Sequence, residues 1–273
     1  MYQILPYLEQ GAVKNIINQK DIASNPIPLY NCPSRRAVTM YFNSTHETEV
    51  SLVDYAATTA GPARGELGDA GWNAFLNDLA PNAANPSEIN SERVQDIYWG
   101  CENCDSGLPD LAIVNHQASI GKPIQFRGII QRVDWNSLEQ KHMGFTQKMT
   151  MARITDGTSN TLLASEKWVH SSYAQGPKED SPWKNGDDFG WADGWDYDQV
   201  RSCMLAPHSD GDGVEPSGVS GYVRENLQFG SAHSSGINAL RADGSVNAID
   251  YSIDIETFNR LGHRDDGEIV TLP

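Results

Sequence analysis

The feature that most constrains the fold is an Asp-Gly pair near the C-terminus with a strand-like run on either side. Residues 237–241 and 245–251 have extended, largely apolar patterns, and Asp243 and Gly244 lie between them. Such a pair favours a tight hairpin, because glycine accepts the left-handed backbone that these turns need. We therefore predict an antiparallel hairpin here.

A short helix is expected directly after this hairpin. Asp254 can accept hydrogen bonds from the first backbone N–H groups of a helix over residues 255–261. Gly262 can end that helix in the left-handed conformation. The C-terminal part of the chain thus predicts a hairpin followed by a helix.

The rest of the chain predicts more strand than helix. Residues 1–18 indicate a helix that is interrupted near Pro6 and Gly11. No alternation of strands and helices recurs, which favours an antiparallel α+β fold over a doubly wound sheet. Strands are expected over residues 51–60, 124–133 and 161–169, the last after a turn over residues 154–160.

Two long segments are rich in residues that break regular structure. Residues 61–121 contain many Gly, Ala, Asn, Asp and Pro residues, and residues 178–215 combine aspartates with tryptophans. We interpret both as loop-rich insertions within one globular domain spanning residues 1–273.

The charge balance excludes some partners. The chain has 36 acidic and 20 basic residues, a formal net charge of −16. Such a field repels the phosphate backbone of nucleic acids and anionic lipid surfaces. No window approaches the ~20 apolar residues of a membrane span.

Catalytic motifs do not occur in the sequence. It has no Gly-x-Ser-x-Gly, His-Glu-x-x-His or phosphate-binding glycine loop, and its seven histidines lack the spacing of helix-borne metal ligands. An enzyme is the least expected class, and no catalytic residue is assigned.

Acidic loops offer a better lead, because Ca²⁺ takes roughly six to eight oxygen ligands. The sequence lacks the EF-hand pattern, so the alternative is a solvated acidic surface whose aspartates cap turns. The candidate ligands are Asp187, Asp188, Asp193, Asp196, Asp198, Asp210 and Asp212.

Tryptophans are interleaved with these aspartates. Flat indole faces beside carboxylates suit sugar rings, so Trp183, Trp191 and Trp195 could form a cell-surface glycan-binding site. Exposed indoles would support this alternative, whereas burial of the indoles, which is common for Trp, would oppose it.

The four cysteines allow several interpretations. Cys101 and Cys104 have the spacing of a zinc knuckle or a redox pair, although no further motif surrounds them. In an exported protein the set can pair in three ways, of which Cys32 with Cys203 and Cys101 with Cys104 is one.

Several short segments together resemble a known family. They are residues 4–10, 30–34, 54–56 with Gly61, 154–161 running into 164–166, 194–196 with Arg201, 229–233 continuing to 243–246, and finally 261–262 and 266–268. In this order they are similar to the bacterial prepilin-like proteins, abundant in planctomycetes, that carry a C-terminal H-x9-DG signature. His233, Asp243 and Gly244 match that signature.

The resemblance implies a pilin-like fold, with an N-terminal helix packed on an antiparallel sheet. It implies a noncatalytic, extracytoplasmic role at the cell surface or in the periplasm, like that of a type II secretion pseudopilin. The expected partners are other pilin-like subunits or envelope components, with polysaccharide as an alternative. Calcium is expected because major pseudopilins often bind it in an acidic loop. The family's leader and apolar helix are missing before Met1, so we expect no membrane span in this chain.

The two ends of the signature are not expected to form one site. A strand of the length that separates His233 from Asp243 spans up to ~33 Å. We therefore interpret Asp243 and Gly244 as the hairpin turn, and His233 as a residue that caps the strand entry or fills a polar pocket.

Overall fold

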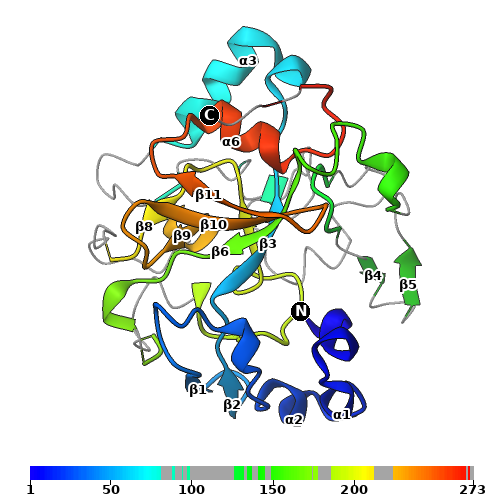
Figure 1. Ribbon diagram of the computed structural model, residues 1–273, viewed down its shortest axis with the longest axis vertical. Helices are drawn as coiled ribbons and strands as arrows, with labels where there is room; N and C mark the ends of the chain where they lie inside the picture. The colour runs from blue at the N-terminus through cyan, green and yellow to red at the C-terminus, as the bar shows by residue number, and fades with distance from the viewer. Residues whose placement is uncertain are drawn as a thin grey trace.

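The computed structural model describes residues 1–80, 88–89, 94, 97–98, 126–131, 134–136, 141–144, 149–173, 175–177, 186–211, 224–268 and 270. Figure 1 shows three levels in this part of the chain. Helices α3 (Arg64–Asp78) and α6 (Ile255–Gly262) lie at the top, a five-stranded sheet lies in the middle, and the N-terminal elements lie at the bottom.

The sheet has the order β11-β10-β6-β3-β7. Neighbouring strands are antiparallel except β3 and β7, which are parallel. The α+β class is therefore confirmed, whereas the expectation of a purely antiparallel sheet is wrong at one edge. The strands are β3 (Tyr55–Thr59), β6 (Leu162–Glu166), β7 (Val200–Ser202), β10 (Gly236–Arg241) and β11 (Val246–Asp250).

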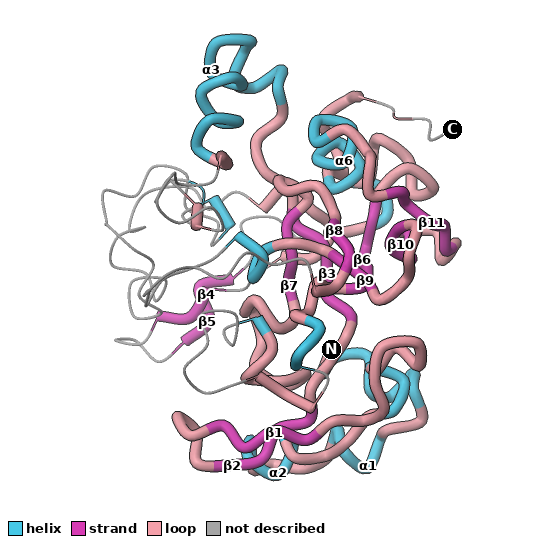
Figure 2. Tube along the Cα trace, turned by 90° about the vertical axis from the view of Figure 1, so that its left-hand side faces the viewer, coloured by secondary structure: helices cyan, strands magenta, loops and turns pink. Residues whose placement is uncertain are grey.

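Apolar side chains cover both faces of this sheet, as the alternation along β3 requires. Ala56 belongs to a buried cluster with Phe258 and Leu261 of α6, so α6 covers one face. The next residue, Ala57, packs on a second cluster that contains Trp72 and Phe75 of α3. Figure 2 shows the two helices at the same end of the sheet.

The N-terminal region forms a third cluster. Leu5, Val13 and Ile27 pack with Val53 and Trp191, beside the sheet rather than on one of its faces. The first predicted helix is indeed interrupted, and the single helix packed across the sheet that the resemblance implies is not seen among the described residues. The elements here are η1 (Tyr2–Leu8), α1 (Gly11–Lys14), α2 (Gln19–Ala23), η2 (Pro28–Tyr30), β1 (Met40–Asn43) and β2 (Thr48–Ser51).

The C-terminal predictions are confirmed in outline. The hairpin of β10 and β11 turns at Asp243 and Gly244, and Asp254 caps α6 by accepting a hydrogen bond from the backbone N–H of Thr257. Gly262 differs: it does not adopt a positive φ, and it is the last residue of the helix. A Cβ there would lie 3.0 Å from those of Ala60 and Cys203, so close packing explains the glycine.

Helix α3 lies within residues 61–121, a segment that the sequence predicts to be a loop-rich insertion and in which no helix was expected. Two other expectations need correction. Residues 126–131 form no strand, although residues 124–133 were predicted as one. The strand expected over residues 51–60 is divided, since β2 ends at Ser51 and β3 begins at Tyr55. The strand after the turn at residues 154–160 is confirmed as β6.

Short elements complete the described fold. None of the described helices is both long enough and apolar enough to cross a membrane. The remaining elements are β4 (Asp134–Asn136), β5 (Lys141–Gly144), η3 (Met151–Arg153), η4 (Ser171–Tyr173), β8 (His208–Ser209), η6 (Arg224–Leu227) and β9 (Gly230–Ser231).

Candidate functional site

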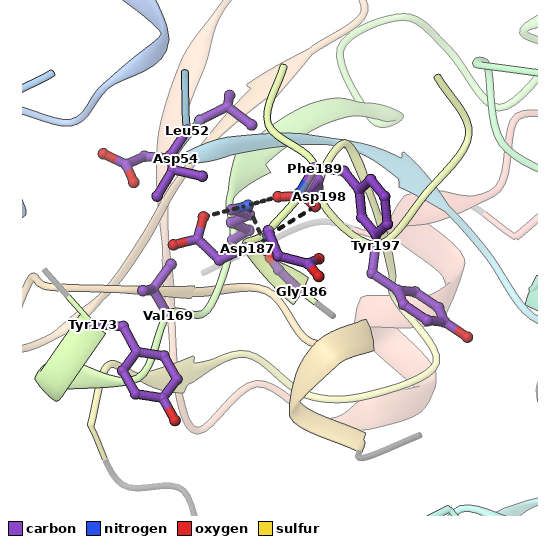
Figure 3. Close-up of polar contacts among 12 residues, drawn as sticks. Leu52, Asp54, Val169, Tyr173, Gly186, Asp187, Phe189, Tyr197 and Asp198 are labelled. Carbon is purple, nitrogen blue, oxygen red and sulfur yellow. Dashed lines mark hydrogen bonds and ion pairs between the residues drawn. The ribbon is translucent and has the colours of Figure 1, made fainter. Parts of the chain in front are cut away.

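A buried ammonium group organises the acidic loop after residue 186. The Lys167 Nζ lies 2.9 Å from Asp187 Oδ1 and 3.0 Å from Asp198 Oδ1, and it donates to the Gly186 carbonyl at 2.9 Å. All three charged side chains are at most 3% exposed. Figure 3 shows Asp187 and Asp198 turned toward one point from opposite sides. Lysine thus stands where a cation would sit between these two carboxylates.

Two adjacent arginines extend this network towards β3. Arg36 binds Asp187 with two hydrogen bonds, at 2.6 and 2.9 Å, and lies 2.8 Å from Asp54 Oδ1. Arg35 binds Asp210 at 2.7 Å and also donates to the carbonyls of Lys167 and Gly230. A planar guanidinium with several donors suits such a branched position.

The pKa values follow from this pairing. Burial alone would raise the pKa of Asp187, but Arg36 and Lys167 outweigh burial and hold it below its ordinary value. Burial raises the pKa of Asp210, and Arg35 offsets only part of that effect. Among the described residues, the bonds that Arg201 donates go to backbone carbonyls, and burial lowers its pKa to about 10.

The seven aspartates predicted as calcium ligands do not share one environment. Asp187 and Asp198 form buried ion pairs with the chain's own cations, and Asp210, whose side chain is 10% exposed, pairs with Arg35. Asp188 is buried, and its backbone N–H donates to Asp198. Asp212 lies outside the described residues. No group of three or more candidate metal ligands forms from aspartates in the described part of the chain.

Asp193 and Asp196 differ from the others because negative charge surrounds them. Burial, followed by the charge of Asp198, raises the pKa of Asp193 to about 6. Burial and the charges of Asp198 and Asp193 raise the pKa of Asp196 well above its ordinary value. A cation would relieve this repulsion, so these two residues remain candidates for the expected calcium site.

The tryptophans in the described part of the chain are less accessible to a sugar ligand than a glycan-binding site requires. Trp191 is fully buried in the N-terminal cluster, and its Nε1 donates to the Asn25 carbonyl at 2.8 Å. Its predicted ligand-binding role is therefore wrong, because a sugar cannot reach the indole face. Trp195 is half-buried against Phe126 and Tyr98, and Trp183 lies outside the described residues.

The two ends of the H-x9-DG pattern are separated, as the strand argument predicts. Asp243 lies in the turn, where its Oδ1 accepts from the N–H and hydroxyl of Ser245 at 2.9 and 2.7 Å. Gly244 has a φ of 88°, which glycine adopts without strain. His233 lies at the other end of β10, just after β9.

A cluster that the sequence reasoning missed lies at His233. Its Nε2 is 3.3 Å from Glu166 Oε1, and one ligand atom from each of Cys32, Glu166 and His233 lies within 4.8 Å of the others. Each residue stands in a different segment of the family resemblance, at residues 30–34, 164–166 and 229–233. The presence of these three residues in motif segments was the one sequence signal that could have identified the cluster. Their proximity to one another depends on the fold and could not be predicted from the sequence.

The two cysteines in the described part of the chain are not bonded to each other. Cys32 and Cys203 are buried free thiols, so the pairing of these two is wrong. Cys203 packs in the cluster under α6, whereas Cys32 is close to Glu166. Cys101 and Cys104 lie outside the described residues.

Comparison with known proteins gives one family match. Residues 125–256 match the model of a family described as "Protein of unknown function (DUF1559)". This segment is similar to DUF1559 proteins. The DUF1559 segment includes Glu166, Lys167 and His233, whereas Cys32 and the arginine pair precede it. No curated protein and no solved structure matches the chain.

Proposed function

We propose that the chain is a noncatalytic, extracytoplasmic surface domain that resembles a pilin or pseudopilin and assembles with other subunits or envelope components. The observation that carries this proposal is an accumulation of exposed apolar side chains in the N-terminal region. Extracytoplasmic location and the pilin relation rest on the resemblance of the motif segments.

The exposed apolar residues are unevenly distributed. In the part of the chain that the structure describes, six of the nine exposed large hydrophobic residues lie before residue 43, namely Ile4, Tyr7, Ile17, Leu29, Val38 and Phe42. Tyr7 is 86% exposed and Ile17 is 99% exposed. Exposed apolar side chains mark interaction sites where they form a contiguous patch, and we propose that these six contribute to one. The inward sides of the same elements already pack in their own cluster, so the outward sides are available for a partner.

The interior supports a structural role. Charged side chains in the motif segments or directly after them are directed at one another or at backbone carbonyls, as Arg35, Arg36, Lys167 and Arg201 illustrate. A catalytic set usually keeps perturbed groups accessible in a cleft. These groups instead join β3, β6 and β7 to the loops that surround them.

Self-association tests the assembly role. Sedimentation velocity over a range of protein concentrations is expected to show reversible association of the wild type, which Ile17→Ser together with Tyr7→Ser abolishes. Val246→Ser is the matched control, because Val246 is 62% exposed but lies on the hairpin. A wild type that stays monomeric, and that forms no cross-link from position 17 to any envelope component in its source cells, would reject the proposal.

Location is tested separately. Fractionation of the source cells is expected to place the chain outside the cytoplasm. Recovery only in the cytoplasmic fraction would contradict the extracytoplasmic part of the proposal.

Calcium stabilisation belongs to the same proposal. It is supported by the uncompensated charge at Asp193 and Asp196, whose pKa values are raised by burial and by neighbouring carboxylates.

A further inference from the structure

Three residues of different ligand types meet where β6, the central strand of the sheet, ends. Cys32 follows η2, Glu166 ends β6 and His233 follows β9, and their ligand atoms all lie within 4.8 Å of one another. Thiolate sulfur, imidazole nitrogen and carboxylate oxygen together are a set that zinc binds in tetrahedral sites. We propose that Cys32, Glu166 and His233 form a zinc site.

The carboxylate is held in the orientation that this site needs. Glu166 Oε2 accepts hydrogen bonds from Ser231 Oγ at 2.9 Å and from the Asn238 N–H at 2.8 Å. Its other oxygen, Oε1, faces His233 Nε2 at 3.3 Å. Supporting hydrogen bonds of this kind orient metal ligands and strengthen metal binding.

The histidine loop is fixed by the same neighbours. The His233 N–H donates to Ser231 Oγ at 3.1 Å, and Tyr251 donates its hydroxyl to the His233 carbonyl at 2.7 Å. The imidazole therefore projects from a backbone that is held at two points. Little ordering is needed for a metal to bind.

The cysteine carries a proton that the metal replaces. Burial raises the pKa of the Cys32 thiol, and a hydrogen bond with Glu166 raises it further, while the N–H of Ser34 donates to the sulfur and opposes this. Zinc binding deprotonates a thiol, so the proton leaves to solvent as the sulfur–zinc bond forms. Affinity for zinc is accordingly expected to fall as the pH falls.

The surroundings accept a divalent cation. Arg35 is a positive group close enough to act on the Cys32 thiol, and its guanidinium is bound to Asp210 at 2.7 Å and to the Gly230 carbonyl at 3.1 Å. Asp54 accepts the Cys32 N–H at 2.8 Å and adds negative charge nearby. Arg36 lies 2.8 Å from the same Asp54 carboxylate, so Asp54 and Asp210 are paired with arginines, and Glu166 is the carboxylate that faces His233.

A cysteine nucleophile fits this geometry less well. Cys32 is 3% exposed, and reactive thiols are accessible and have lowered pKa values. By contrast, the His233 side chain is 36% exposed while that of Glu166 is 1% exposed. The site therefore opens to solvent on the histidine side, where water can complete the coordination.

Cobalt and zinc binding test the proposal directly. The protein is first freed of metal with a chelator, in a Cys101→Ser/Cys104→Ser background that removes the other spaced cysteine pair. Addition of Co²⁺ is expected to produce a thiolate-to-cobalt charge-transfer band that saturates at one equivalent and is displaced by Zn²⁺. Cys32→Ser is expected to abolish the band, whereas Cys203→Ser retains it.

His233→Gln gives a second readout, because a half-exposed side chain tolerates this change. Zinc affinity is expected to fall by about 10- to 100-fold or more, with the far-ultraviolet circular dichroism of the metal-free protein unchanged. His208→Gln, in an exposed histidine on β8, leaves zinc affinity at the wild-type value. The absence of a thiolate band, a band that survives Cys32→Ser, or a zinc affinity unaffected by His233→Gln would overturn the proposal.

Discussion

Lys167 and Asp198 form an ion pair of 3.0 Å in which neither side chain has any exposed surface. Asp198 Oδ2 also accepts the N–H groups of Asp188 and Phe189, at 3.2 and 2.8 Å. The pair thus fixes both the end of β6 and the start of the acidic loop. Charges placed so deeply are costly unless each keeps its partner.

Lys167→Met is expected to destabilise the fold strongly. The substitution leaves Asp198 buried without its cation, and it removes one of the two cations that pair with Asp187. Breaking a buried ion pair in this way lowers the free energy of unfolding by about 3–5 kcal/mol. Denaturant unfolding measures this loss.

Arg64→Met is the control for this change, because Arg64 pairs with Asp69 and Glu256 at the surface and its side chain is 44% exposed. We expect a much smaller loss there, because water screens exposed ion pairs. Equal stability of the two variants would show that Lys167 is not a central part of the network.

Gly262→Ala is expected to destabilise although it introduces a better helix former. The new Cβ would lie 3.0 Å from the Cβ atoms of Ala60 and Cys203 and 3.1 Å from the sulfur. Overpacking of this kind costs about 1–3 kcal/mol. Gly65→Ala in α3 meets nothing within 4 Å, so we expect about 0.5–1 kcal/mol of stabilisation there. Thermal melting compares the two, and a stabilised Gly262→Ala would refute the packing argument.

Local signals predicted the C-terminal structure well. The turn at Asp243 and the helix cap at Asp254 depend on hydrogen bonds to residues two or three positions away, so both can be predicted from the sequence. Helix α3 was missed because glycines interrupt it, and Gly68 has a φ of 66° inside it. Trp72 and Phe75 of this helix are buried in the core. The sequence of the helix lacks the strong helical periodicity of apolar residues that would have predicted such a buried face.

Long-range contacts explain the remaining differences. Arg127 has the sequence context of a strand, but it binds Glu66 of α3 at 2.7 Å, and the Gly128 carbonyl accepts from Arg264. Similarly, the aspartates looked like free calcium ligands because their cations, Arg35, Arg36 and Lys167, come from other segments. The Cys32, Glu166 and His233 cluster could not be inferred for the same reason.

Acid should weaken the fold through His263. The imidazole is buried and donates from Nε2 to the Gly61 carbonyl at 2.8 Å. Burial, followed by the charge of Arg127, lowers its pKa from 6.5 to about 4. The unfolded chain therefore binds more protons between about pH 4 and 6.5, and stability falls as the pH falls through that window.

His263→Gln is expected to reduce this dependence by up to about 3 kcal/mol between the two pH limits. Urea unfolding at a series of pH values provides the measurement. His208→Gln, which changes an exposed histidine, should retain the wild-type dependence. An identical pH profile for wild type and His263→Gln would contradict the assignment.

Calcium should stabilise the loop that contains Asp193 and Asp196. Burial and neighbouring carboxylates raise the pKa of Asp193 from 3.8 to about 6, and they raise that of Asp196 well above its ordinary value. The folded state therefore binds more protons than the unfolded chain, so this contribution is greatest at low pH and is lost as the pH rises through about 6. A bound cation supplies the missing positive charge above that pH.

We expect Ca²⁺ to raise the melting temperature at neutral pH, and excess chelator to lower it again. Asp196→Asn removes one carboxylate, so the melting temperature without Ca²⁺ should rise while the response to Ca²⁺ disappears. Asp265→Asn is the control, because its side chain is 42% exposed and pairs with Arg264 instead. The Cys32→Ser variant tests whether the proposed zinc site is responsible for the rise in melting temperature. If this variant still responds to Ca²⁺, the zinc site does not cause the rise. Melting that is unchanged by both Ca²⁺ and chelator would exclude calcium stabilisation.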